Sequence, residues 1–100
     1  MRLLSIFILA GILCGGTNHG LSKASAAMKA GMYKEALGHI SVAQKTDETN
    51  PDVYRMKALL HEALDEPKLA LSAWKNCLKY SKDEFMSSEA KIHIQSLSAE

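Results

Sequence analysis

The feature of this 100-residue sequence that most constrains its fold is an internal repeat with a period of 34 residues. The segment 30–37 aligns with the segment 64–71, and the alignment continues without a gap as far as Lys45 and Lys79. Small residues match small residues and large apolar residues match large ones, as in the pairs Ala36 and Ala70, Leu37 and Leu71, Ile40 and Trp74, and Ala43 and Cys77. A fixed period of this size is typical of chains that stack copies of one supersecondary unit.

The spacing of the apolar residues predicts that this unit is a pair of helices. In three stretches apolar side chains recur every three or four residues and so share one helix face; the stretches are Tyr33, Ala36, Leu37, Ile40 and Ala43, then Val53, Met56, Leu60, Ala63 and Leu64, then Ala70, Ala73, Trp74, Cys77 and Leu78. Asn50 and Pro51 suit a helix cap and first position, and Gly31 suits a helix end. We expect an all-α fold with helices near 19–30, 33–46, 51–64, 67–80 and 84–97.

The helix expected at 84–97 has two different sides. One side is apolar and carries Met86, Ala90, Ile94 and Leu97. The other side is expected to be polar and carries Ser88, Glu89, Lys91 and Gln95. Because a terminal repeat needs a polar outer face, the pattern predicts that this is a capping helix.

The repeat resembles the tetratricopeptide repeat, which has the same period. The second half of that repeat is matched by Gly31, Tyr33, Glu35, Ala36 and Leu37, followed by Ile40 and Ala43. Tyr54 and Ala58 stand where the family places the Trp and the small Gly of the next first helix, whereas Lys57, His61 and Glu48 replace the usual Leu, Tyr and Pro. The resemblance covers roughly residues 18–82. It implies helical-hairpin repeats at about 17–50 and 51–84, followed by the capping helix at 84–97.

The resemblance also implies a binding surface. Tetratricopeptide repeats present their first helices along a concave groove, and the corresponding residues here are Leu21, Ser25, Met28, Arg55, Met56, Leu59, Glu62, Met86, Ala90 and His93. Methionine suits adaptable apolar contact with a peptide. The expected function is therefore protein–protein interaction or scaffolding, with a partner helix or extended segment in the groove. The alternative is a small structural subunit that self-associates, as a homo-oligomer, through the same groove.

Other classes of function find little support in the residues. The formal net charge is +1, so no strong field attracts nucleic acid. The four histidines lie on four different expected helices, and no pair has the spacing of two metal ligands on one face. No grouping of acid, base and nucleophile is visible. We expect neither an enzyme nor a cofactor or metal site.

The N-terminal residues form a separate segment. The run from Leu3 to Leu13 has eleven residues without a charge, follows Arg2, and is too short for an ordinary membrane span. It fits the apolar core of a secretory signal peptide, with cleavage after Gly16, and leaves a mature domain at 17–100. We expect export to the periplasm or the medium of a bacterium. Lipidation of Cys14 would instead anchor the protein to a membrane, as would a segment that is left uncleaved.

Overall fold

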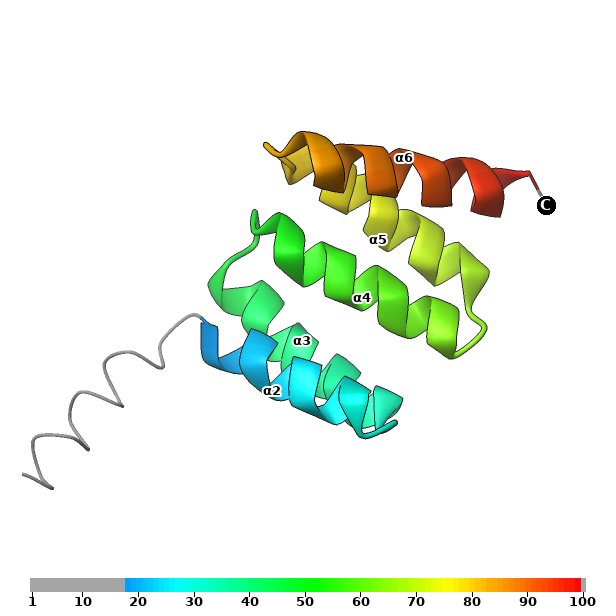
Figure 1. Ribbon diagram of the computed structural model, residues 1–100. Helices are drawn as coiled ribbons and strands as arrows, with labels where there is room; N and C mark the ends of the chain where they lie inside the picture. The colour runs from blue at the N-terminus through cyan, green and yellow to red at the C-terminus, as the bar shows by residue number, and fades with distance from the viewer. Residues whose placement is uncertain (1–17, 100) are drawn as a thin grey trace, which may run out of the picture.

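The computed structural model describes residues 18–99, which form an all-α fold of helical hairpins (Figure 1). The helices in this range are α2 (Asn18–Lys29), α3 (Tyr33–Thr46), α4 (Pro51–Ala63), α5 (Pro67–Tyr80) and α6 (Glu84–Ser98). The sequence-based prediction is confirmed, since each helix ends within one residue of its expected bounds. The expected signal peptide, its cleavage point after Gly16 and the lipidation candidate Cys14 lie outside the described residues.

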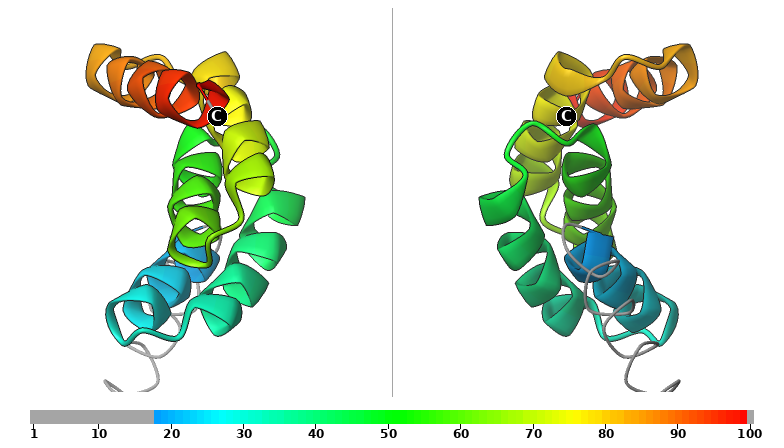
Figure 2. Two further views of the ribbon diagram at one scale, coloured as in Figure 1. Left: turned by 90° about the vertical axis from the view of Figure 1, so that its right-hand side faces the viewer. Right: turned by 90° about the vertical axis from the view of Figure 1, so that its left-hand side faces the viewer.

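The helices stack in a single curved layer of pairs. The closest packing joins α2 to α3 and α4 to α5, and α6 then packs on α5. Figure 2 shows that α2, α4 and α6 follow the inner side of the curve, whereas α3 and α5 follow the outer side. The stack therefore has one concave surface, which is made by every second helix.

The turns between paired helices repeat the same hydrogen bonds 34 residues apart. Gly31 has a φ of 80° and Asp65 has a φ of 58°, so both take the left-handed conformation that ends a helix. The backbone N–H groups that follow them reach back to the preceding helix, from Met32 to the Ala27 carbonyl and from Glu66 to the His61 carbonyl, both at 2.8 Å. The period seen in the side chains is thus also a period of backbone geometry.

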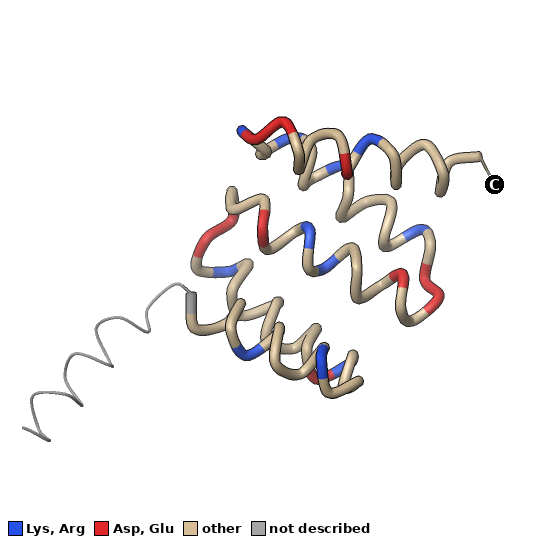
Figure 3. The backbone as a smooth tube through the Cα atoms, in the orientation of Figure 1, with Lys and Arg blue, Asp and Glu red and all other residues tan. Residues whose placement is uncertain are grey.

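The starts of α4 and α6 are set by local capping. The Asn50 side chain accepts a hydrogen bond from the Asp52 backbone N–H at 2.9 Å, and Pro51 fills the first position of α4. Asp83 accepts in the same way from the Phe85 backbone N–H at 2.9 Å. Acidic residues gather at the turns before α4, α5 and α6, where they complement the positive ends of the helix dipoles (Figure 3).

Two buried clusters hold the stack together, and α4 belongs to both. The first contains Ala24, Ala27, Ala36, Ile40, Ala43, Val53 and Leu60. The second contains Tyr54, Ala58, Ala73, Trp74, Cys77 and Ala90. The many alanines let the helix axes approach closely, while Ile40 and Trp74 fill the space beside them. Because two faces of α4 are buried, this helix joins one hairpin to the next.

The expectation of a polar outer face on α6 is wrong in part. Glu89 is half-buried and turns toward α4, where it pairs with Arg55. The side of α6 that faces away from α5 exposes Phe85 and Ile92, whose exposed fractions are 87% and 66%. The rotation of α6 about its own axis causes this difference; it is set by packing on α5 and by the side-chain pairs that join α6 to α4.

Candidate partner-binding surface

The sequence assigned ten residues of α2, α4 and α6 to a groove on the concave surface. Nine of them are half-buried and so keep some access to solvent. Ala90 is the exception, because it is fully buried in the second cluster. Its assignment as a partner contact is therefore corrected: Ala90 lies on the side of α6 that packs against α5.

The apolar members of this surface also support the two cores. Leu21, Met28 and Met56 pack against the first cluster. Leu59 and Met86 pack against the second. The structure buries part of each of these side chains. The apolar area left for a partner is smaller than the residue types alone suggest.

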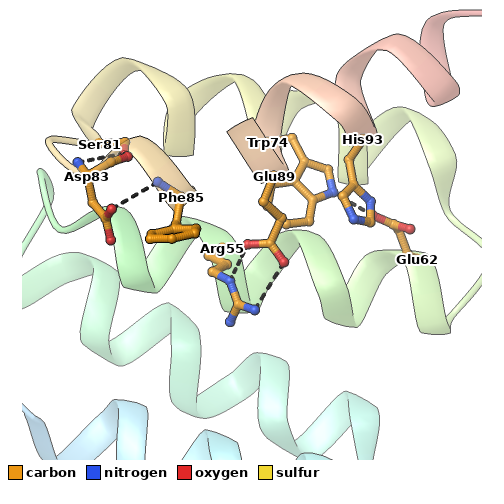
Figure 4. Close-up of polar contacts among 8 residues, drawn as sticks. All are labelled: Arg55, Glu62, Trp74, Ser81, Asp83, Phe85, Glu89 and His93. Carbon is orange, nitrogen blue, oxygen red and sulfur yellow. Dashed lines mark hydrogen bonds and ion pairs between the residues drawn. The ribbon is translucent and has the colours of Figure 1, made fainter. Parts of the chain in front are cut away.

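A bidentate ion pair crosses the concave surface between α4 and α6. Arg55 Nε donates to Glu89 Oε1 at 2.6 Å, and Arg55 Nη2 donates to Glu89 Oε2 at 3.1 Å (Figure 4). The hydrogen bond from Arg55 lowers the pKa of the Glu89 carboxyl below its ordinary value, and the same bond raises the pKa of Arg55. The two residues are 34 positions apart and so occupy the same place in successive units.

A second polar group on this side joins three helices. Trp74 Nε1 of α5 donates to Glu62 Oε2 of α4, and His93 Nδ1 of α6 lies 2.7 Å from the same oxygen (Figure 4). The His93 ring stacks on the Trp74 ring with centroids 4.3 Å apart. Since Trp74 is fully buried, Glu62 satisfies a donor that would otherwise be costly to bury. Glu62 and His93 thus fix the position of α6 against the preceding hairpin.

A shallow depression lies beside the ion pair. It has a volume of about 400 Å³ and is lined by Arg55, Asp83, Phe85, Met86 and Glu89. The exposed Phe85 ring and the Met86 side chain make part of it apolar, while Arg55 and Glu89 supply charge. The depression thus combines an apolar wall with a fixed ion pair.

A polar hollow on another side is formed by α3, α4, α5 and the α3–α4 turn. It has a volume of about 380 Å³ and is lined by Ser41, Gln44, Lys45, Glu48, Thr49, Tyr54, Lys57 and Tyr80. Tyr54 stacks on Tyr80 with centroids 5.6 Å apart and donates through its hydroxyl to the Glu48 carbonyl at 2.6 Å. Burial raises the pKa of the Tyr54 hydroxyl. Through these contacts the Tyr54–Tyr80 pair stabilises the turn before α4.

Two other chemically reactive side chains in residues 18–99, Cys77 and His61, are buried. Cys77 is buried without a disulfide, and burial raises the pKa of its thiol to about 11. His61, which stands where the resemblance expects a tyrosine, is buried and lies 2.8 Å from Glu66 Oε1. Within this range no three residues of the metal-ligating types come together, and no helix is long and apolar enough to cross a membrane.

Comparisons with protein-family models, with curated proteins and with solved structures each found no match for this chain.

Two residues of this surface were missed by reasoning from the sequence. Glu89 was assigned to the outer polar side of its helix, and Phe85 received no role. The repeat period held a signal for the first of them: Glu89 lies one period after Arg55, so equivalent places in neighbouring units carry opposite charges. Nothing in the sequence indicated that Phe85 would be exposed.

Proposed function

We propose that this protein is an exported interaction module of the tetratricopeptide-repeat type, which binds a helix or an extended segment of another protein on its concave surface. The observation that carries the proposal is the geometry of the stack. Alternate helices face one curved side, and that side combines half-buried apolar side chains with polar groups held in fixed positions.

The likeness to tetratricopeptide repeats is supported by more than the residue pattern. Paired helices α3 and α5 begin and end 34 residues apart, at Tyr33 and Pro67 and at Thr46 and Tyr80. The left-handed turns at Gly31 and Asp65 recur with the same spacing. A stack of this kind buries a continuous core between units and leaves one side of each first helix for other contacts.

The concave surface has the chemistry of a polypeptide site rather than of a catalytic one. Leu21, Met28 and Met56 offer adaptable apolar contact toward the α2 end. Arg55 and Glu62 lie at its centre, and each is already held by a partner on α6. Such preorganised groups can form hydrogen bonds to a bound backbone with little loss of side-chain freedom. A partner helix or strand therefore meets apolar anchors on α2 and α4 and oriented polar groups between α4 and α6.

The binding test uses variants of the full chain in an affinity capture from the native cell. Ser25→Arg adds bulk on the concave side of α2, where Ser25 is half-buried. The double variant Met56→Ser with Leu59→Ser removes apolar contact from α4. Val42→Ser is the matched control, since Val42 is a 59% exposed apolar residue of α3, outside the concave surface.

The expected result is that the wild type and the Val42→Ser control retain the same partner and that both concave variants lose it. Circular dichroism checks that the helical content is kept. Met56 and Leu59 also support the cores, so the double variant can unfold. In that case the Ser25→Arg variant alone gives the result of the test. Retention of the partner by a folded Ser25→Arg variant would show that the concave surface is not the site.

Export is tested separately by the intact mass of the protein from its native host. Cleavage after Gly16 gives a chain that begins at Thr17, as the apolar run before it suggests. A mass that includes a diacylglycerol group on Cys14 would establish membrane anchoring instead. An unprocessed chain beginning at Met1 would refute the export part of the proposal.

A further inference from the structure

The side of α6 that faces away from α5 places two exposed large apolar residues on one helix face, which no other helix in residues 18–99 does. This α6 outer face consists of Phe85, Ser88, Ile92 and Gln95, all of which are exposed. Their spacing of three and four residues places them along one line of the helix. Other exposed large apolar residues in this range, which are Met32, Val42 and Leu69, occur singly on different elements.

The repeat period shows what kind of element covers such a face. The equivalent positions of Ser88, Ile92 and Gln95 are Tyr54, Ala58 and His61 on α4, and Gly20, Ala24 and Ala27 on α2. The α4 residues are buried in packing with α5. On α2, Ala24 and Ala27 are buried in the first cluster with residues of α3. In both hairpins this line of residues is covered by a helix, and on α6 the same line is open.

We propose that the α6 outer face is a self-association surface, and that α6 of one molecule packs antiparallel against α6 of a second copy. The charged residues beside this face indicate that its occupant is a second copy of the chain. Glu84 and Lys91 are both exposed, lie two turns apart on the same flank, and form no ion pair within the described part of the chain. When two identical helices pack antiparallel, the same flank of each faces the other, so each Glu84 meets the Lys91 of its partner copy.

The apolar residues fit the same register. An alignment that brings Glu84 near Lys91 of the second copy also brings Phe85 against Ile92 of that copy, and symmetry repeats both contacts. Ser88 then lies beside the two-fold axis, where a small side chain permits close approach. The antiparallel arrangement also places the negative end of one helix dipole near the positive end of the other.

The contact is expected to be reversible. Each copy contributes only two large apolar side chains, which is far less than the interface of an obligate dimer. Ile92 also replaces the alanine found at the equivalent positions 24 and 58, and so holds the two helix axes farther apart than those within the hairpins. The dimer population should therefore rise with protein concentration.

Sedimentation equilibrium of the full chain over a roughly hundredfold concentration range tests the proposal. We expect a monomer–dimer equilibrium for the wild type. Phe85→Ser with Ile92→Ser should remove the dimer, whereas Leu69→Ser, a 52% exposed apolar residue of α5, should leave it unchanged. A wild type that stays monomeric throughout, or a double variant that dimerises as the wild type does, overturns the proposal.

Charge reversal distinguishes a second copy from any other occupant. Glu84→Lys places two lysines at each symmetry-related contact, and Lys91→Glu places two glutamates there, so each variant alone should dimerise more weakly by roughly two- to thirtyfold. A mixture of the two variants restores opposite charges at both contacts and should form a mixed dimer about as strong as the wild-type dimer. If mixing restores nothing, the α6–α6 register is refuted.

The result is independent of the proposed binding function. These measurements use the chain alone. Phe85 also borders the depression beside the Arg55–Glu89 pair, so the charge variants Glu84→Lys and Lys91→Glu, which line no part of that depression, separate the two proposals. A module can thus fail to dimerise and still bind its partner, or dimerise through α6 and bind nothing on its concave side. The outcomes separate the two proposals.

Discussion

The close approach of α2 and α3 makes a sharp prediction about two glycines. A Cβ atom added at Gly20 would lie 2.9 Å from the Ala43 Cβ and 3.1 Å from the His39 carbonyl oxygen. Neither contact belongs to a flexible side chain that can swing away, so the two helices must move apart. At Gly38, within α3, an added Cβ would meet nothing within 4 Å. The two sites thus offer the same substitution with and without a clash.

The opposing free energies decide the sign of each effect. Alanine in place of glycine in a helix gains up to about 1 kcal/mol. Overpacking in a close contact costs about 1–3 kcal/mol. We therefore expect Gly38→Ala to stabilise the fold by about 0.5–1 kcal/mol, and Gly20→Ala to destabilise it by about 1 kcal/mol net. In a domain of this size, 1 kcal/mol corresponds to roughly 4–8 °C in melting temperature.

Thermal unfolding followed by circular dichroism measures both variants against the wild type. Gly38→Ala controls for the general effect of the substitution on helix stability. The reasoning requires the two melting temperatures to move in opposite directions. If Gly20→Ala melts at or above the wild-type temperature, then α2 and α3 are not as close as the structure places them.

Three further predictions concern two buried alanines, the Arg55–Glu89 ion pair and the buried Cys77. Ala36→Leu and Ala70→Leu should each lower the unfolding free energy by about 1–3 kcal/mol, since both alanines are fully buried, and chemical denaturation would measure the loss. The hydrogen bond from Arg55 is the main cause that lowers the pKa of Glu89 from 4.5, so the stability from this pair is present above pH 4.5 and is lost as the pH falls through the lowered pKa. Glu89→Gln should flatten that part of a curve of unfolding free energy against pH. An unchanged curve would count against the pair. The buried Cys77 thiol, with its pKa of about 11, should resist alkylation at pH 8 until denaturant is added, and peptide mapping that finds rapid native labelling would contradict its burial.

The sequence by itself was sufficient for the helices and their pairing order. Asn50 and Pro51 start α4, and Gly31 takes the left-handed conformation that ends α2. Both depend on interactions among residues only a few positions apart. Such local signals can be read directly, because capping and backbone strain depend on near neighbours. The 34-residue period extended these local assignments to a stack, and the helix bounds and the all-α fold agree with it.

The tertiary structure alone decided which side of each helix meets which neighbour. Ala90 and Glu89 are adjacent in sequence, yet one is fully buried toward α5 and the other pairs with Arg55 across the concave surface. Their roles depend on the rotation of α6 about its axis, which arises from contacts with two other helices. The apolar pattern of one helix does not determine this rotation, because several rotation angles about the helix axis place some apolar residues inward. For the same physical reason the exposed line of Phe85 and Ile92 is visible only once α6 is packed on α5 and paired with side chains of α4.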